Sequence, residues 1–516
     1  MYAKMARALA LALVLLPQHA ASLRPTTAAV PRLRRIHHLE AQQRRPATLM
    51  AHSNSAALRA SKAPTAAAEA SPASTILSIL KSIVGAGIFS LSAGLATGPG
   101  LLPSCLMLLL LGSTSAYTFY IVGRAAAETG CTTNKQLWER LVDERTGWIY
   151  DVIVGVLCLG GLVQFMGTMA NLVQFIGPWL AQLTFPAPPD MSASVFTRAA
   201  YGALAHSSYE AQLLFLTALA MPLCLARNLH ALRHASAVGA IGVLYAAVLL
   251  VVRAVDGSYR LGGAFESTPA IAGTNVIGIQ LGGLPSFLGS LTTAFIAHLN
   301  IPRFYNELRA PASEGGVTAI SPGTAARASA PAASAASAAS RTPPKVRLFG
   351  RVVATSFGLA MLSTAIVMAS GYVIFGDACT GFVLNNFAVT DHGAALLRVA
   401  TLLSVLGVHP LTFLGLRDAC APLLVQRLKL FSETGLRLTL CALVLFLSLT
   451  FRNIARIVAV RGAFLGTLVT MVLPVIIYLK SERGQQEGPV SRGVHHALVG
   501  YGAIMAVVGT VCVLRT

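Results

Sequence analysis

Eleven apolar windows, each long enough to cross a lipid bilayer, recur between residues 75 and 514 of this 516-residue chain. A bilayer core of about 30 Å is crossed by roughly 20 apolar residues in a helix, because each residue rises about 1.5 Å. Hydrophobic residues make up 55% of the chain and charged residues 11%, which excludes a string of soluble domains. We therefore predict an all-α integral membrane protein with a multi-pass domain over 75–514. The windows, numbered one to eleven, are 75–97, 101–123, 148–177, 209–226, 236–253, 285–306, 351–376, 396–424, 435–451, 457–479 and 494–514.

The basic residues lie mainly in the connections on one side of these windows. The chain has 39 Lys and Arg against 19 Asp and Glu, a formal charge of +20. If the first window starts in the cytoplasm, the connections on that side hold eighteen Lys or Arg. The opposite connections and the C-terminal end hold eight, Arg461 among them. Cytoplasmic loops of membrane proteins are enriched in positive charge, so we predict a cytoplasmic N-terminus. Basic patches interleaved with aromatic residues, typical of a nucleic-acid surface, are absent from the sequence.

Residues 1–74 differ from the rest and form a basic segment of their own. They carry ten Lys or Arg, and their apolar run, 8–16, is too short to cross a bilayer. The run has the layout of a secretory signal peptide, and the stretch behind it is typical of a transit peptide. The pair resembles the two-part presequence of plastids with extra envelope membranes, which would place the protein in a plastid envelope or an endomembrane. The alternative is a disordered cytoplasmic tail near anionic lipid, with the protein in the vacuolar or plasma membrane.

A second segment without apolar windows runs from about residue 310 to residue 344, between the sixth and seventh windows. It consists mainly of Ala, Ser, Pro and Gly. Such a composition cannot bury enough apolar surface to fold alone. We predict a flexible, low-complexity cytoplasmic loop, and a segment controlled by phosphorylation is the functional alternative.

The first window contains a pair of glycines that weakens a continuous helix. Gly85 and Gly87 flank Ala86 within K-S-I-V-G-A-G-I-F-S-L-S, residues 81–92. Each glycine costs about 1 kcal/mol relative to alanine in a helix, and a backbone without side chains can approach a ligand closely. Discontinuous transmembrane helices use such breaks to present amide N–H groups to an anionic group. Close packing of helices through small residues explains the same pair equally well.

Five further stretches accompany this one in a fixed order. They are M-P-L-C-L-A-R-N-L-H-A-L-R-H-A-S at 221–236, A-F-I-A-H-L-N-I-P-R-F-Y-N-E-L at 294–308, G-Y-V-I-F-G-D and V-L-N-N-F within 371–387, H-P-L-T-F-L-G-L-R-D-A at 409–419, and L-V-T-M-V-L-P-V-I-I-Y-L at 468–479. The six stretches together resemble the amino acid/auxin permease family. No single motif decides the resemblance, which rests on their order across 74–514.

The resemblance implies a fold of the leucine-transporter type. In that fold, windows one to five and six to ten form inverted repeats, helices one and six are discontinuous, and the eleventh helix is peripheral. The substrate lies between the two breaks. The residues themselves support the second break less well than the first, since 297–300 contains no glycine and Pro302 lies one position earlier than the usual proline. The second break is therefore expected from the resemblance alone.

The resemblance also assigns a substrate site to six positions. These are Gly85, Ala86 and Gly87 in the first window and Phe295, Ile296 and Ala297 in the sixth. The backbone amides of the first group are expected to hold the carboxylate of the substrate. The second group is expected to shape the pocket for the substrate's side chain, although ordinary packing explains Phe295 equally well.

Five polar residues are candidates for coupling or gating, namely Lys81, His298, His409, Tyr305 and Glu307. Lys81 resembles the lysine of proton-coupled members, where sodium-coupled members have an asparagine, and its ammonium group can replace the sodium ion. The alternative is a lysine that extends to the membrane surface or pairs with a carboxylate. A histidine near the middle of the membrane can relay protons, but a buried, hydrogen-bonded histidine is nearly as common. Tyr305 and Glu307 are expected near the cytoplasmic end of the sixth helix, where charged pairs can act as gates. The alternative, which the residues favour, is the plain polarity of a helix end.

These observations predict a secondary active transporter of small neutral amino acids that works by alternating access. Lys81 favours coupling to protons, or uniport, over coupling to sodium. The chain has no Walker A motif, nucleophile elbow or H-E-x-x-H pair, so we expect no enzymatic activity, cofactor or metal. The alternative function is a membrane sensor that binds an amino acid without appreciable flux. Protein partners cannot be named from the sequence.

Overall fold

The computed structural model describes residues 69–184, 194–205, 208–225, 233–265, 276–278, 280–310 and 343–515. Most of the predicted N-terminal segment 1–74 and of the predicted loop 310–344 lies outside these ranges. Within them the chain is almost entirely helical. The strand-like pairing recorded there is an isolated parallel bridge between Ala70 and Leu308.

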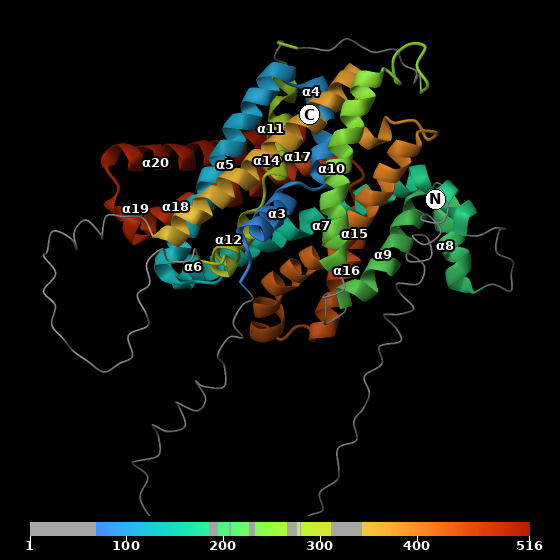
Figure 1. The fold of residues 1–516 in the computed structure, drawn as a ribbon. Helices are drawn as coiled ribbons and strands as arrows, with labels where there is room; N and C mark the ends of the chain where they lie inside the picture. Colours follow the sequence, from blue (N-terminus) through green and yellow to red (C-terminus); the bar gives the residue numbers. More distant parts are fainter. Residues whose placement is uncertain are drawn as a thin grey trace, which may run out of the picture.

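Helices cover all eleven predicted windows (Figure 1). In the described ranges, eight helical stretches are long and apolar enough to cross a membrane, and a bent pair in the first window makes a ninth. The shorter α9 and the partly described α10 cover windows four and five. In window order the elements are α3 (Pro72–Ile83), η1 (Ala86–Ser90) and α4 (Leu91–Thr97); α5 (Leu101–Thr129); α7 (Gly147–Thr184); α9 (Tyr209–Leu225); α10 (Arg233–Asp256); α11 (Leu284–Ala294), η5 (His298–Asn300) and α12 (Ile301–Glu307); α14 (Pro344–Phe375); α15 (His392–Ala421); α16 (Glu433–Thr450); α17 (Ile454–Arg461), η9 (Gly462–Gly466), η10 (Leu468–Val472) and α18 (Leu473–Lys480); and α20 (Pro489–Ile504), η11 (Met505–Gly509) and α21 (Thr510–Arg515).

Helix interruptions divide both the first and the sixth window, five windows apart. In Figure 1, α4 and α11 lie in the upper half of the bundle, and α3 and α12 lie in the lower half. The two breaks therefore lie at middle height. Because η1 packs against α11, they are also neighbours in space.

Glycines allow α11 to lie unusually close to the tenth window. A Cβ atom on Gly289 would overlap the carbonyl oxygen of Ala459, and one on Gly462 would overlap the carbonyl oxygen of Gly289. Small residues are typical of contacts between membrane helices because they let two backbones approach. This contact fixes the upper half of the broken sixth helix against α17 and η9.

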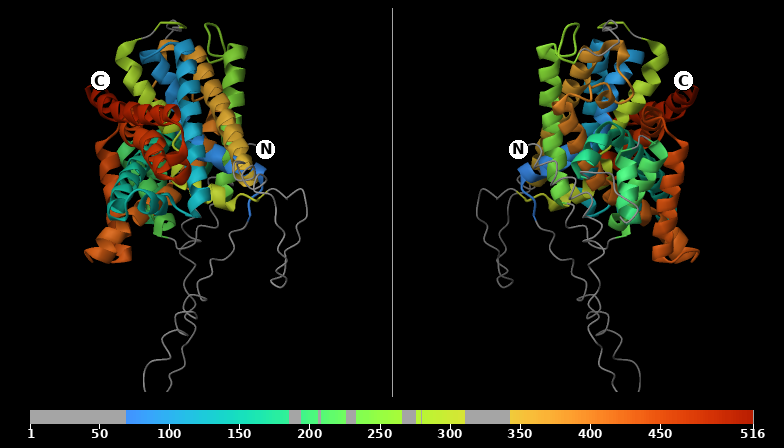
Figure 2. Two further views of the ribbon diagram at one scale, coloured as in Figure 1. Left: turned by 90° about the vertical axis from the view of Figure 1, so that its left-hand side faces the viewer. Right: turned by 90° about the vertical axis from the view of Figure 1, so that its right-hand side faces the viewer.

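The eleventh window is peripheral, as expected. In its most apolar stretch only 22% of the residues are buried inside the protein. The two views of Figure 2 show these C-terminal helices, coloured red, at the outer edge of the bundle. They pack on the tenth window, chiefly against η9 and η10.

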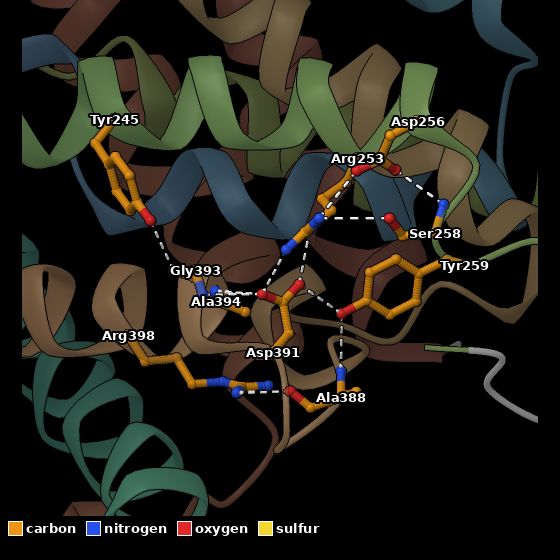
Figure 3. A network of polar contacts seen from close by, with 10 residues as sticks. All are labelled: Tyr245, Arg253, Asp256, Ser258, Tyr259, Ala388, Asp391, Gly393, Ala394 and Arg398. Carbon is orange, nitrogen blue, oxygen red and sulfur yellow. Dashed lines mark hydrogen bonds and ion pairs between the residues drawn. The ribbon is translucent and has the colours of Figure 1, made fainter. Parts of the chain in front are cut away.

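A network of charged and polar groups fastens the connection between α14 and α15 to the end of α10 (Figure 3). Asp391 is fully buried and caps α15 by accepting hydrogen bonds from the amides of Gly393 and Ala394. Arg253 donates to both of its carboxylate oxygens, at 2.9 and 2.8 Å, and the Tyr259 hydroxyl donates at 3.0 Å. The network thus ties the C-terminal end of α10 to the N-terminal end of α15.

Arg398, about two helical turns beyond Asp391 on α15, supports the same connection. Its fully buried guanidinium donates to the carbonyls of Leu384, Phe387 and Ala388 at 2.6 to 3.4 Å. It also lies 4.8 Å from the ring centroid of Phe175 on α7. Carbonyl dipoles and an aromatic face thus compensate this charge in place of a carboxylate.

The ionic state of Asp391 follows from competing effects. Burial by itself raises the pKa of this carboxyl, but hydrogen bonds from Arg253, the Ala394 amide and Tyr259 outweigh it, so the pKa lies below its ordinary value. A lowered pKa in the folded state stabilises the fold above the unfolded value of about 3.9, and that contribution is lost only as the pH falls through the lower folded value. Between pH 5 and pH 8 the network therefore stays ionised.

We expect Asp391→Asn to destabilise the protein on the order of 3 kcal/mol, because Arg253 loses its buried counter-charge. The control is Asp418→Asn, which removes a carboxylate that is 63% exposed beside Arg417 and is expected to cost less than about 1 kcal/mol. Thermal unfolding of purified protein at pH 5 and pH 8 should show the same large loss at both values. A loss that shrinks markedly at pH 5 would contradict the assignment, since it would mean that the carboxyl is already protonated there.

Candidate functional site

The first helix is interrupted at the predicted glycine pair. α3 ends where Val84 adopts an extended backbone, with φ −86° and ψ 95°. Gly85 continues the extended conformation, with φ −121° and ψ −171°, and precedes η1. The helical pieces on either side are bent by 42°. The predicted discontinuity of the first helix is therefore confirmed.

The break leaves amide groups available and space in front of them. Among the described residues, no acceptor is recorded for the Gly85 amide. The first amides of a 3₁₀-helix, here those of Ala86 and Gly87, also have no acceptor within their own helix. A Cβ atom on Gly85 would meet nothing within 4 Å. The backbone at 85–87 can therefore donate hydrogen bonds to an anionic group.

Gln164 of α7 lies opposite this break. Its Nε2 atom is 3.7 Å from the position of a Cβ atom on Gly87. Its side chain is 3% exposed, and its Oε1 atom has no hydrogen-bond partner among the described residues. A buried amide oxygen without a partner is unusual and costs free energy. The sequence analysis did not identify Gln164, although a glutamine inside the third apolar window was a visible signal.

The sixth helix is interrupted without any glycine. α11 ends at Ala294, residues 295–297 are not helical, and η5 and α12 follow. Pro302 explains the position, because a proline lacks the N–H that would bond to the carbonyl four residues earlier, and its ring crowds that carbonyl. The carbonyl concerned is that of His298. The second break, expected from the resemblance alone, is thus confirmed.

Neighbouring helices supply the hydrogen bonds that this break loses. Asn134, the first residue of α6 (Asn134–Leu141), donates from Nδ2 to the His298 carbonyl at 2.6 Å. Ser115 of α5 donates from Oγ to the Phe295 carbonyl at 3.4 Å. Backbone groups inside a membrane must be satisfied by protein, so these two side chains make the interruption tolerable.

The ring of His298 is held within the bundle. Its Nε2 atom is 3.0 Å from Oγ1 of Thr118, and its ring meets Phe119 edge-on at 5.5 Å between centroids. The residue is 2% exposed, and its Nδ1 atom has no partner among the described residues. One nitrogen thus orients the ring, and the other has no hydrogen-bond partner in the described part of the chain.

The side chains at 295–297 point toward the surrounding helices. The Phe295 ring is fully buried and stacks on Phe357 of α14 at 6.3 Å. Ile296 extends toward Gly466 of η9, with Cδ1 3.1 Å from the position of a Cβ atom there. Ala297 is 4% exposed. These contacts give Phe295 a packing role.

Lys81 and His409 occupy different surroundings. Lys81 lies in the last turn of α3, four residues before Gly85, and is partly buried. No hydrogen bond or ion pair to another described residue is recorded for it. His409 belongs to α15, and its side chain faces α9, where its Nδ1 atom is 3.7 Å from the sulfur atom of Cys224. Within the described ranges, no three His, Cys, Asp or Glu residues are grouped so that they could hold a metal ion.

Hydrogen bonds join the segment before α3 to the C-terminal end of α12 at the lower end of the bundle. The Ala70 amide donates to the Glu307 carbonyl at 2.7 Å, and the Arg309 amide donates to the Ala70 carbonyl at 2.9 Å. The Glu307 side chain pairs with Arg303 on its own helix at 2.8 Å. Tyr305 is buried against Phe349, 5.4 Å between ring centroids. The start of α3 and the end of α12 therefore form one unit.

A family model described as "Transmembrane amino acid transporter protein" matches residues 68–334 and 337–513. These ranges include both breaks, ten whole windows and the eleventh window up to residue 513. They also include the six stretches on which the resemblance rests.

Two relatives illustrate the similarity in sequence. "Solute carrier family 38 member 10" of Mus musculus is 28% identical over 159 residues, which cover 28% of this chain and 14% of the mouse protein. "Vacuolar amino acid transporter 6" of Saccharomyces cerevisiae is 28% identical over 247 residues, which cover 46% of this chain and 49% of the yeast protein. The alignments thus span half or less of these relatives.

The fold is similar to that of a solved transporter. The inward-facing conformation of Mhp1 superposes with a TM-score of 0.53 at 12% sequence identity, covering 88% of this chain and 93% of the other. At such an identity the similarity concerns the fold alone. It confirms the predicted leucine-transporter type of architecture, with two discontinuous helices.

We expect Gly85→Ala to leave the fold intact but to reduce uptake of labelled amino acid into proteoliposomes about tenfold. The backbone at Gly85 suits any residue and the new methyl group meets no atom, so stability should change by less than about 1 kcal/mol. The methyl group would, however, occupy the space in front of the free amides. The control is Gly358→Ala, another glycine with open surroundings, on the exposed face of α14. Equal uptake by both variants would argue against a ligand at this break.

Proposed function

We propose that this chain, which belongs to the transmembrane amino acid transporter protein family, is a secondary active carrier of amino acids that works by alternating access. The observation that carries the proposal is the break at 85–87, where free amides face open space beside the second break. An amino acid is a zwitterion, and its carboxylate needs donors of this kind inside a membrane.

In the proposed pocket, the identified hydrogen-bonding groups serve the α-carboxylate and the α-ammonium group of the substrate. The amides at 85–87 bind the α-carboxylate, as the positive end of a half-helix favours negative charge. The unpartnered Oε1 of Gln164 can accept a hydrogen bond from the α-ammonium group. The sequence predicts small neutral substrates, and the side chains at 295–297 pack against neighbouring helices.

The proposal also includes coupling of amino acid transport to protons. Lys81 is partly buried and has no recorded partner among the described residues, four residues from the carboxylate site. A lysine in such a place can exchange its proton as the surroundings open and close. His298, with one free ring nitrogen, is the second candidate for a proton relay.

The test is uptake by purified protein in liposomes. We expect labelled amino acid to accumulate inside, and a pH gradient across the liposome membrane to accelerate its entry. Liposomes without protein and liposomes that contain heat-denatured protein serve as controls. If the folded protein binds amino acids but no uptake is measured with or without a gradient, the protein is a sensor and the transport proposal is wrong.

We expect Lys81→Ala to remove the acceleration by a pH gradient while some exchange of amino acid across the membrane persists. The reason is that the alanine variant has no ammonium group to exchange a proton beside the substrate. Lys480→Ala, at the exposed end of α18, removes an equal charge and is the matched control. An unchanged response of the Lys81 variant to the gradient would exclude this lysine from coupling.

A further inference from the structure

Arg461 places a positive charge inside the bundle without a counter-charge. It is the last residue of α17, and its side chain lies over two glycines of α7. Its Cδ atom is 3.2 Å from the position of a Cβ atom on Gly160, and Nη1 is 2.6 Å from that position on Gly161. Its Nε atom is buried, and no hydrogen bond or ion pair is recorded for the side chain among the described residues. The glycine pair thus makes room for a guanidinium group that nothing in the described structure neutralises.

Two other arginines that contact buried groups of the bundle are compensated. Arg253 binds both oxygens of Asp391, and Arg398 donates to three backbone carbonyls. A guanidinium keeps its charge under all ordinary conditions, and a charged side chain within a membrane is energetically costly unless it is paired. The contrast indicates that the partner of Arg461 is an anion that comes from outside the chain.

Gln164 connects this charge with the first break. Gly160, Gly161 and Gln164 lie on one face of α7, because residues three and four apart on a helix are neighbours, about 5–6 Å between Cβ atoms. The guanidinium covers the two glycines, and the Gln164 amide, one turn along, reaches Gly87. The free amides at 85–87, the unpartnered Gln164 oxygen and Arg461 therefore follow one another along a single face.

We propose that Arg461 binds a second carboxylate of the substrate, so that the carrier prefers acidic amino acids. In this arrangement the amides at 85–87 hold the α-carboxylate, Gln164 accepts from the ammonium group, and Arg461 receives the side-chain carboxylate through paired N–H···O bonds. The inference rests on the proposed function and replaces the small neutral substrate expected from the sequence. A neutral substrate would leave the guanidinium unpaired in the loaded carrier.

The test compares uptake of labelled glutamate and alanine by the full-length protein in liposomes. We expect wild-type protein to prefer glutamate, and Arg461→Gln to raise the KM for glutamate at least about tenfold more than the KM for alanine, a difference of about 1.4 kcal/mol. Arg461→Lys, which keeps the charge but not the paired geometry, should retain part of the preference. The matched control is Arg456→Gln, which removes an exposed arginine of the same helix.

Thermal stability separates a ligand-binding role from a structural one. Because no partner is lost, Arg461→Gln should unfold at the same temperature as wild-type protein or a higher one. Added glutamate should raise the unfolding temperature of wild-type protein more than that of the variant.

Other outcomes would overturn the inference in distinguishable ways. If wild-type protein carries alanine but not glutamate, or if Arg461→Gln and Arg456→Gln keep the same preference, the second carboxylate site is wrong and the proposed function stands. Equal weakening of both substrates by Arg461→Gln would place the α-carboxylate at Arg461 and also reject the second site. Absence of uptake for every amino acid by folded wild-type protein would reject the proposed function itself.

Discussion

Lipid offers no hydrogen-bond partner to a free peptide group, so each interruption of a transmembrane helix must be satisfied by the protein or by a ligand. The sixth helix illustrates the first solution. Pro302 deprives the His298 carbonyl of its donor, and Asn134 replaces that donor at 2.6 Å. Ser115 does the same for Phe295. The short helix α6 and the buried polar side chains of α5 are thus explained by the backbone groups that they serve.

The first helix illustrates the second solution. Its break leaves the Gly85 amide without a recorded acceptor among the described residues, and the nearest polar side chain, Gln164, also has an unpaired oxygen. Elsewhere in the described bundle, buried charges such as those of Asp391 and Arg398 are fully surrounded by donors or acceptors. Unpaired donors and acceptors that lie together beside open space at a helix break are a physical sign of a ligand site.

Much of this architecture could be predicted from the residues. The length and spacing of the apolar windows predict the helices, because the thickness of a bilayer leaves few alternatives. The glycine pair predicts the first break, since glycine is a poor helix former. The second break was harder, because a proline that follows the break by several residues does not reveal which carbonyl is freed or whether a neighbour can satisfy it. Gln164 and Arg461 are polar residues inside apolar windows, so both could be noticed in the sequence. Arg461 was nevertheless counted with the charges of the outer connections, because the sequence does not show which helix packs against it.

The sequence alone determined the positions and helical type of the apolar elements and the weak point of the first one, since these depend on hydrophobicity and backbone propensity within a single segment. The tertiary structure alone decided which polar groups found partners. Asn134 and His298 are separated by 164 residues, and Arg461 lies against glycines about 300 positions earlier in the chain. Whether such a group is paired or free depends on the helix that folds beside it, and no local pattern contains that information.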